Sequence, residues 1–368
     1  MTRIVQAANF VTPTSGGLRT TLLHLGAGYA AAGHDVIQIL PGDHDLVEHD
    51  GPNITRVWLS APSLPGTGYR VHRDVARLRR LLVRAAPDVL EVHDRTTLRG
   101  LGQWARRAGV HSCVISHERL DRWLRQWLPT QLPLRQIADR SNNVLAASYD
   151  AVVCTTEWAA EEFARIGADN LRVVPLGVDA HTFTPRVTRW AHDDVLLVMT
   201  SRLSKEKRPE LAVAAVRELV RRRVPVRLVV CGDGPMRRSL WRDGQGLPIE
   251  WRGFVADRSE LASVLAYADV AIAPGPIETF GLGALESLAC GTPVVVNRNS
   301  ALPAIVGDAG RSVPSSGWCF ADAVQELLGV DEVWRRTAAR RRAEMFDWNR
   351  TVRGFLSVHG LRQQAKAA

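Results

Sequence analysis

The sequence lacks a hydrophobic run long enough to cross a membrane. None of its apolar stretches approaches the roughly 18–20 residues that a membrane-spanning helix requires. The N-terminus enters an apolar segment at Ile4, and it has neither a basic flank nor a cleavage site of the kind that marks a signal peptide. These absences argue against an integral membrane protein, and we expect a cytoplasmic one.

Cysteine is sparse and irregularly spaced. The chain has five cysteines, no C-x-x-C pair and no histidine cluster beside them; they are Cys113, Cys154, Cys231, Cys290 and Cys319. A disulfide framework and a structural zinc site both need closely spaced ligands, so neither is expected. We predict buried, reduced thiols instead.

Lysine is nearly absent, although the chain is strongly basic. Only three lysines are present, so arginine carries most of the net charge of +9. Such a charge attracts nucleic acid, anionic lipid or phosphorylated metabolites, and by itself it does not choose among them. Because the arginines are spread over many predicted helices and are not gathered with aromatics at one site, we expect no nucleic-acid partner.

What is present is an alternation of short apolar strands and amphipathic helices. A chain of 368 residues with 46% hydrophobic residues has room for two domains, each with its own core. In the first half we expect strands at 4–8, 35–40, 89–93, 113–116 and 151–155, and helices at 18–32, 71–86, 100–108, 120–128 and 157–166. Such alternation predicts a doubly wound α/β sheet.

The second half repeats this alternation. We expect strands at 195–200, 226–230, 249–255, 268–274 and 293–296, helices at 210–222, 261–266 and 282–289, and helices through most of 321–361. The predicted domains are therefore 1–180 and 195–345, joined by a polar, proline-containing linker at 181–194. From its order in the chain alone, we expect the helical segment 346–368 to pack back on the first domain.

The region 274–296 carries two carboxylates around a glycine-rich turn. Glu278 follows the predicted strand 268–274, and Glu286 lies in the predicted helix that Gly291 ends. A strand end followed by a helix N-terminus is where an open α/β sheet binds anions. Taken alone, the pattern also fits an ordinary crossover with two surface acids.

Other strand ends carry basic residues, glycines or histidines. Arg202 and Lys207 lie in a basic loop before a helix, a placement that suits a diphosphate because it adds charge-assisted hydrogen bonds to the helix terminus. Gly16 and Gly17 precede the first helix, where backbone can approach a ligand closely, although any tight turn uses such a pair. His117 ends another strand and is equally compatible with an ordinary loop or helix-cap histidine.

The predicted helix 120–128 has an unusual composition. One face carries Leu120, Trp123, Leu124, Trp127 and Leu128, and the opposite face is basic. A basic amphipathic helix with tryptophan is typical of contact with an anionic membrane surface. A helix packed on the domain with an exposed arginine face explains the pattern equally well.

Taken together and in order, these motifs resemble the retaining glycosyltransferases of family 4. That family has the GT-B fold, in which two Rossmann-like domains face each other across a cleft that holds the active site. The resemblance rests on these motifs: Ser15-Gly16-Gly17, His117, Pro175 to Asp179, Arg202 with Lys207, Gly232-Asp-Gly-Pro235, Gly253-Phe254-Val255, Glu278 to Glu286, and Ala289-x-Gly291-x-Pro293. It spans most of the chain and is most specific in the C-terminal half.

The resemblance implies catalytic roles for four residues and a donor site around them. Arg202 and Lys207 would stabilise the leaving diphosphate, and His117 would orient the donor sugar. Glu278 would bind hydroxyls of that sugar, and Glu286 those of the ribose. The remaining predicted donor-binding residues are Gly16, Gly17, Gly234, Phe254, Val255, Thr279, Phe280 and Gly281.

The family's reaction sets further expectations. The acceptor attacks from the face that the leaving phosphate occupies, and that phosphate takes the acceptor proton, so we expect no metal, no Asp-x-Asp metal motif and no cofactor beyond the nucleotide-sugar substrate. One departure is Gly275, where many relatives carry serine.

The segments Arg95 to Gly100 and His117-Glu118 are most similar to actinobacterial mannosyltransferases. Those enzymes use GDP-mannose on phosphatidylinositol mannosides or related glycolipids. This similarity implies a lipid-linked or glycolipid acceptor and a protein bound peripherally at the inner face of the plasma membrane. Two alternatives stay open: a family 4 transferase with a UDP-sugar or a soluble acceptor, and a non-catalytic GT-B protein that binds anionic membrane.

Overall fold

A computed structural model describes residues 1–11, 16–64, 68–129, 131–185 and 194–361. The chain folds into two compact units, of which one comprises 1–177 with 348–368 and the other comprises 178–347. Most of the predicted linker 181–194 and the last seven residues of the predicted segment 346–368 lie outside the described residues.

The first unit is built on an eight-stranded sheet in the order β3-β4-β2-β1-β5-β6-β7-β8. All neighbouring strands are parallel except β3 and β4. The strands are β1 (Arg3–Ala7), β2 (Asp35–Gly42), β3 (Leu46–His49), β4 (Ile54–Ser60), β5 (Val89–Val92), β6 (His111–Ser116), β7 (Ala151–Cys154) and β8 (Leu171–Val173). The helices are α1 (Gly17–Ala31), α2 (Val75–Ala85), α3 (Leu101–Ala108), α4 (Leu120–Trp127), α5 (Leu134–Ala146), α6 (Glu157–Ala164) and α14 (Trp348–Val358).

Helices cover this sheet, whose central strands are mostly apolar and buried. In β5 and β7 every residue is buried, as expected for parallel strands with a core on each side. The helices contribute amphipathic stripes: α2, for example, buries Leu78 and Leu82, and its arginines occupy the other faces. Among the described residues of this unit, three clusters of buried apolar side chains result.

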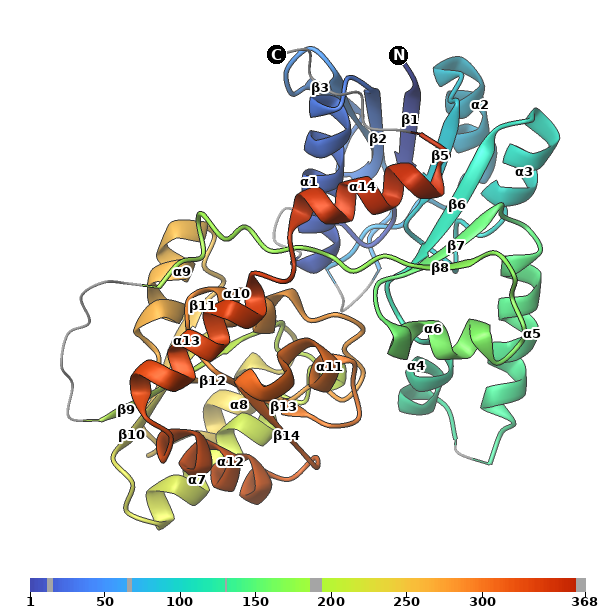
Figure 1. Cartoon of the computed structure of the whole chain (residues 1–368). Coiled ribbons are helices and arrows are strands. Elements are labelled where there is room, and N and C mark those ends of the chain that lie inside the picture. Colours follow the sequence, from blue (N-terminus) through green and yellow to red (C-terminus); the bar gives the residue numbers. More distant parts are fainter. Residues whose placement is uncertain (12–15, 65–67, 130, 186–193, 362–368) are drawn as a thin grey trace. The chain divides into compact units, whose positions relative to one another are not determined.

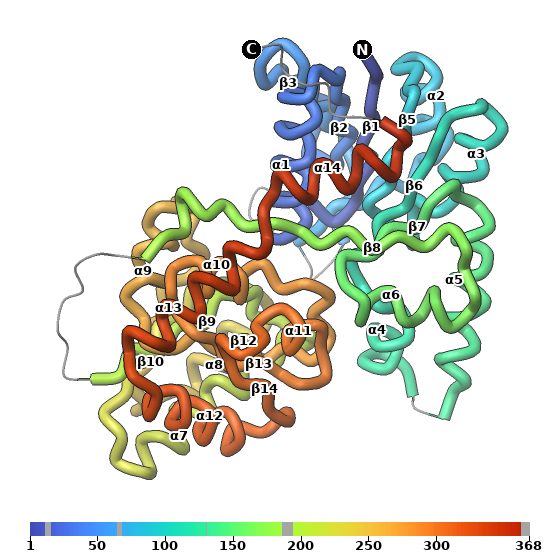
Figure 2. Tube along the Cα trace, viewed as in Figure 1, coloured from blue at the N-terminus to red at the C-terminus, as the bar shows by residue number. Residues whose placement is uncertain are grey.

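The last helix, α14, belongs to the first unit although it follows the second in sequence. It lies beside α1, as Figures 1 and 2 both show, with α14 in red and α1 in blue. The Trp348 ring stacks on His24 with centroids 4.4 Å apart, and Thr351 Oγ1 donates to the Pro175 carbonyl at 2.8 Å. The C-terminal helix therefore completes the helical layer that covers one face of the first sheet.

The second unit has a six-stranded, all-parallel sheet in the order β11-β10-β9-β12-β13-β14. Its strands are β9 (Val195–Thr200), β10 (Val226–Cys231), β11 (Ile249–Gly253), β12 (Val270–Ala273), β13 (Val294–Asn297) and β14 (Gly310–Val313). Its helices are η1 (Lys205–Lys207), α7 (Glu210–Arg221), α8 (Arg237–Asp243), α9 (Arg258–Tyr267), α10 (Leu282–Ala289), α11 (Leu302–Val306), η2 (Gly307–Ala309), α12 (Gly317–Leu328) and α13 (Glu332–Ala343).

The strand order of the second unit is that of a dinucleotide-binding fold. Counted within the unit it runs 3-2-1-4-5-6, so the order reverses between β9 and β12. Ligands of open α/β sheets bind at this switch point, beyond the carboxyl ends of the strands. The expected fold class, two doubly wound α/β domains, is confirmed. None of the helices within the described residues combines the length and apolar character needed to cross a membrane.

Candidate active site

In the second unit, β9 and β12 place two predicted catalytic loops side by side. The strands are parallel neighbours, with Val198 paired to Ala271. The loop after β9 carries Arg202 and Lys207, and the loop after β12 carries Glu278. Because both loops leave the same edge of the sheet at its switch point, their side chains reach a common region.

Lys207 and Glu278 meet directly in this region. The Lys207 ammonium donates a hydrogen bond to Glu278 Oε1 within an ion pair. Both side chains are partly exposed, at 29% and 20% of their surface, so each is accessible to solvent. The structure thus brings together a cation suited to phosphate and a carboxylate suited to sugar hydroxyls. Arg202 lies in the same loop and is half-buried.

The turn at Gly234 is hydrogen-bonded to the basic loop that carries Arg202 and Lys207. The Leu203 amide donates to the Asp233 carbonyl at 3.0 Å, and the Met236 amide donates to the Leu203 carbonyl at 2.9 Å. A Cβ atom on Gly234 would lie 2.4 Å from the Leu203 carbonyl oxygen, so only glycine allows this approach. The turn therefore fixes the path of the backbone that carries Arg202 and Lys207.

The Glu278 loop runs directly into the N-terminus of α10. Gly281 is the residue before this helix, with φ of 78°, and a Cβ atom there would lie 2.3 Å from Leu302 Cδ2. The Phe280 ring packs edge-on against Phe346, with centroids 5.9 Å apart, and is buried together with Thr279. Because the Phe280 side chain is committed to packing, its backbone amide is the group suited to an anion at the helix terminus.

Gly275, the departure from the family pattern, lies beside the same pair. A Cβ atom on this residue would lie 3.4 Å from Glu278 Cγ and 3.5 Å from the Lys207 Cα atom. These are ordinary or nearly ordinary contacts, so the fold also accommodates the serine of many relatives. The substitution removes one hydroxyl from the neighbourhood of Glu278 and leaves the backbone unchanged.

Glu286 occupies a different environment from Glu278. It is buried on α10, and its Oε1 atom lies 3.3 Å from Arg258 Nη2. Burial raises the pKa of Glu286 to about 7, while Arg258 opposes the shift and Asp179 adds to it. The Arg258 guanidinium also lies 4.8 Å from the centroid of the Phe183 ring. The two carboxylates of the E-x7-E element thus lie in different surroundings, Glu286 buried beside Arg258 and Glu278 partly exposed beside Lys207.

Arg258 was not predicted from the sequence as a site residue. It belongs to no quoted motif and follows the Gly253-Phe254-Val255 segment by three residues. Its place in the first turn of α9, opposite Glu286, depends on how α9 packs against α10. Sequence spacing carries no signal for this pair.

Phe254 and Val255 follow β11, on the same carboxyl edge of the sheet but two strands from β9. The turn is held by a 2.7 Å hydrogen bond from the Gly232 amide to the Gly253 carbonyl. The Phe254 side chain is 45% exposed, so its ring is available to pack against a flat group such as a nucleobase.

In the first unit, Gly16 and Gly17 lie at the N-terminus of α1. Gly16 is the N-cap residue, and its carbonyl accepts from the Thr20 amide at 3.1 Å. Both glycines are exposed, and Ser15 of the same motif lies outside the described residues. The helix has 15 residues and no acidic residue in its first turn, features that suit an anion at its N-terminus.

His117 lies at the end of β6 and contacts a second histidine. Its Nε2 atom is 3.0 Å from His93 Nδ1, and the two rings stack with centroids 5.3 Å apart. Burial lowers the pKa of His117 to about 3, the neighbouring His93 adds to this effect, and Glu91 opposes it. The half-buried His117 ring is therefore neutral at neutral pH.

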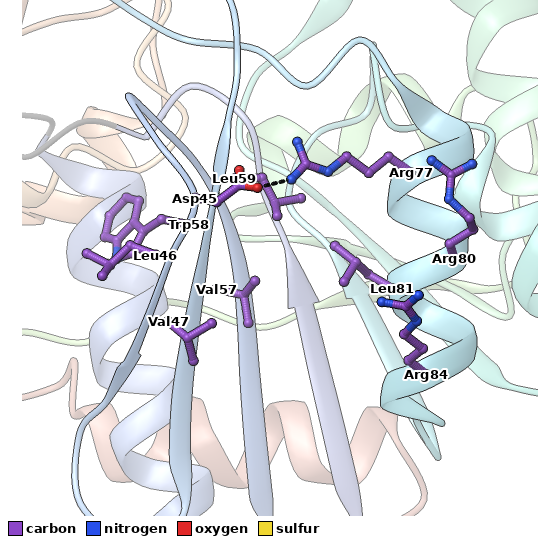
Figure 3. Close-up of a pocket in the computed structure, with 10 residues that line it drawn as sticks. All are labelled: Asp45, Leu46, Val47, Val57, Trp58, Leu59, Arg77, Arg80, Leu81 and Arg84. Carbon is purple, nitrogen blue, oxygen red and sulfur yellow. Dashed lines mark hydrogen bonds and ion pairs between the residues drawn. The ribbon is translucent and has the colours of Figure 1, made fainter.

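The expectation of no Asp-x-Asp motif was wrong, because Asp43-His44-Asp45 is such a triplet. Both carboxylates are balanced by protein cations: Asp43 Oδ1 lies 2.5 Å from Arg70 Nη2, and Asp45 pairs with Arg77. Asp45 lines a cavity of about 460 Å³ between α2 and the β3–β4 hairpin (Figure 3). The carboxylates of the triplet are thus committed to arginines on the first unit.

Comparison with known proteins identifies the family. Residues 16–178 match the glycosyl transferase 4-like domain, and residues 194–329 match the glycosyl transferases group 1 domain. A GDP-mannose-dependent α-(1-6)-phosphatidylinositol dimannoside mannosyltransferase from Mycobacterium tuberculosis is 48% identical over 367 residues, covering 97% of this chain and 96% of that protein. A D-inositol 3-phosphate glycosyltransferase from Xylanimonas cellulosilytica is 34% identical over 59% of this chain and 58% of that protein.

Among solved structures, a sucrose-phosphate synthase from Thermosynechococcus elongatus matches with a TM-score of 0.80, covering 96% of each chain at 21% identity. That likeness shows the fold, whereas the mycobacterial relative is similar in sequence over nearly the full length of both chains. The protein therefore belongs to glycosyltransferase family 4 and is a glycosyltransferase with the GT-B fold.

Proposed function

We propose that this glycosyltransferase moves an α-mannosyl residue from GDP-mannose to a phosphatidylinositol mannoside, with retention of configuration at the anomeric carbon. The observation that carries the proposal is the 48% identity, over 97% of the chain, to a relative named as a GDP-mannose-dependent α-(1-6)-phosphatidylinositol dimannoside mannosyltransferase.

The paired loops of the second unit support the donor half of the reaction. As the bond from the sugar to the diphosphate breaks, negative charge develops on the leaving group. Lys207, with Arg202 in the same loop, would stabilise that charge. Glu278, held by Lys207, would accept hydrogen bonds from hydroxyls of the mannosyl group.

Glu286 and Phe254 are the residues we assign to the nucleoside. Glu286 would bind the ribose hydroxyls, and Arg258 at 3.3 Å favours the ionised carboxylate that such binding uses. The exposed ring of Phe254, with Val255, would pack against guanine.

The transfer needs no group beyond the substrates. The acceptor hydroxyl attacks C1 on the face from which the diphosphate leaves, and a leaving phosphate oxygen takes the hydroxyl proton. One C–O bond breaks and one forms, so the products are GDP and the mannosylated lipid. His117 would orient the mannosyl group by a hydrogen bond to one of its hydroxyls.

The helix α4 supports a membrane-bound acceptor. Trp123 and Trp127 are 41% and 53% exposed, so part of each ring reaches solvent. Leu128 and Leu132, just beyond the helix, are also exposed. An exposed aromatic and apolar surface with Arg125 beside it suits the interface of an anionic bilayer, and we propose that it holds the enzyme peripherally at the inner face of the plasma membrane.

One experiment tests donor, acceptor and stereochemistry together. The purified enzyme is incubated separately with GDP-mannose, UDP-glucose and UDP-galactose, each with phosphatidylinositol dimannoside in mixed vesicles. We expect one hexose to be added from GDP-mannose alone, as seen by mass spectrometry, and to be released by an α-mannosidase.

A Glu278→Gln variant serves as the inactive control. Transfer from a UDP-sugar, transfer only to a soluble acceptor, or a β-linked product would each overturn the corresponding part of the proposal.

A further inference from the structure

The carboxylate of Glu91 in β5 is fully buried, and His93 connects it to His117. Four side chains surround it. Gln6 Nε2 and His93 Nε2 lie 2.6 Å and 3.4 Å from Oε2, and the Tyr29 hydroxyl and His359 Nε2 each lie 2.6 Å from Oε1. A carboxylate offers about four lone-pair sites, so this one is saturated.

The saturated carboxylate is ionised. Burial alone would raise the pKa of Glu91, but the hydrogen bonds from His359 and His93 outweigh it and hold the pKa well below its usual range. An ionised carboxylate only accepts hydrogen bonds, so both histidines must present an N–H to it. This places a hydrogen on Nε2 of His93 and on Nε2 of His359.

Some of the same side chains are also close enough to one another for a different use. Glu91, Cys113 and His359 have ligand atoms within 4.8 Å of one another, an arrangement that a metal ion can use. Burial holds the pKa of the Cys113 thiol well above its usual range, and the Glu91 lone pairs accept hydrogen bonds instead. The cluster is therefore best described as a hydrogen-bond hub.

The hydrogen bonds to Glu91 determine which ring nitrogen carries the hydrogen in His93 and, through it, in His117. With Nε2–H of His93 directed at Glu91, a neutral His93 has its lone pair on Nδ1, which lies 3.0 Å from His117 Nε2. His117 must then carry its hydrogen on Nε2 and its own lone pair on Nδ1. When the rings are neutral, this proton arrangement fits the contacts from Glu91 to His93 and from His93 to His117.

We propose that Glu91 and His93 are positioning residues that fix His117 as the Nε2–H tautomer, so that Nδ1 accepts a hydrogen bond from a hydroxyl of the donor sugar. The inference rests on the proposed function for the contact between His117 and the sugar. Neither residue touches the substrate; each acts through the next ring. The path runs from β5 through the residue that follows it to the end of the neighbouring strand β6.

The first measurement concerns the tautomer and needs no substrate. Protein labelled with ¹⁵N-histidine is examined by long-range ¹H–¹⁵N correlation, and the His117 signals are identified by their loss in His117→Gln. We expect a protonated Nε2 and an unprotonated Nδ1 in the wild type, and a mixture of tautomers in Glu91→Gln. Tyr29→Phe removes a different donor to the same carboxylate and should leave the His117 tautomer unchanged.

The second measurement concerns the sugar contact. We expect Glu91→Gln to raise the KM for GDP-mannose by roughly 10-fold, because His117 in the other tautomer no longer accepts a hydrogen bond from the sugar hydroxyl. The inhibition constant of GDP should be unchanged, since GDP carries no sugar for His117 to hold. A merely structural role for Glu91 would weaken GDP and GDP-mannose together.

The outcomes separate the two hypotheses. A His117 tautomer identical in wild type and Glu91→Gln would overturn the positioning role. A changed tautomer with unchanged KM would support that role and overturn the proposed sugar contact. If thermal unfolding shows that Glu91→Gln does not fold, His93→Leu replaces it, because leucine removes the acceptor for His117 Nε2–H; an unchanged tautomer there would overturn the proposal equally.

Discussion

Lys207 and Glu278 form an ion pair that joins the loops after β9 and β12. The strands are neighbours at the switch point of the second sheet, so two short loops suffice to bring these side chains together. The pair holds opposite charges at one place. A diphosphate and the hydroxyls of a sugar would engage the two members separately, the ammonium with phosphate oxygen and the carboxylate with hydroxyl groups.

The first prediction is that both members of this pair are required for turnover. We expect Lys207→Ala and Glu278→Ala each to lower kcat/KM by roughly 10²–10³, as for the loss of an electrostatic contact to a developing charge. The double variant should lose little more than either single variant, because residues that act as a unit are not additive. Steady-state kinetics with GDP-mannose and the lipid acceptor measures all three.

The matched control for that prediction is Lys205→Ala. Lys205 is exposed and lies in the same short 3-10 helix as Lys207. Its replacement by alanine removes the same charge from the loop. Its kinetics should stay close to wild type. Equal losses in the two lysine variants would mean that the general charge of the loop matters and that the pairing with Glu278 does not.

The second prediction follows from the raised pKa of Glu286. Its pKa is about 7 in the folded protein and near 4.5 in the unfolded chain, so the native state holds the extra proton between these values. The contribution of Glu286 to the free energy of unfolding therefore falls as pH rises through this window. Between pH 4.5 and pH 8, we expect the free energy of unfolding of Glu286→Gln to rise by about 3 kcal/mol relative to that of the wild type.

Urea unfolding at the two pH values measures this gain. Taking the difference between variant and wild type cancels the titration of other groups. The exposed Glu260, also on the second unit, provides the control variant Glu260→Gln, which removes one carboxylate from the surface. A pH-independent difference for Glu286→Gln would show that folding does not raise the pKa of this carboxylate.

Much of the fold could be predicted because local signals agree with the tertiary structure. The helix α10 has the predicted bounds, since an apolar repeat lies between Gly281 and Gly291. The strands β3 and β4 were missed: β3 is exposed at every position, so it lacks the apolar pattern that marks a strand. The helix α5 was also missed; it starts directly after Pro133, and proline both interrupts helices and fits their first turn.

The candidate site, like the fold, could be predicted only in part. Lys207 and Glu278 could be predicted because each follows a recognisable strand, and neighbouring parallel strands bring their ends together. His93 could be noted at a strand end, but its role could not, since its partner Glu91 lies within the strand. The hydrogen bond between Glu91 and His359 joins positions 268 residues apart, and no local pattern encodes such a contact.

The third prediction concerns metals. Because protein cations can neutralise the leaving diphosphate, we expect activity to persist in excess EDTA and to be unaffected by added Mg²⁺ or Mn²⁺. The Asp43–Asp45 triplet gives a specific check, since both carboxylates are paired with arginines. Replacing Asp43 by asparagine should leave the response to EDTA unchanged. Loss of activity on chelation, restored by one of these ions, would contradict the prediction.

The last prediction concerns α4. Replacing both Trp123 and Trp127 by alanine should weaken binding to vesicles that contain phosphatidylinositol by about 10-fold or more, since burying one large apolar side chain is worth roughly 1.5–3 kcal/mol. Sedimentation with anionic and zwitterionic vesicles, at low and high salt, measures this. Binding of the wild type should be weaker at high salt and on zwitterionic lipid, because Arg125 and its neighbours contribute through charge.

A second basic surface provides the control for α4. Arg80 and Arg84 on α2 border the cavity beside Leu46 and Val47 (Figure 3), away in sequence from the tryptophans. Replacing both arginines by alanine removes two charges without altering α4. If this variant loses vesicle binding while the tryptophan variant keeps it, the membrane contact lies on α2 and not on α4. If neither variant changes binding and the wild type ignores anionic lipid, the acceptor must reach the enzyme without a stable membrane contact.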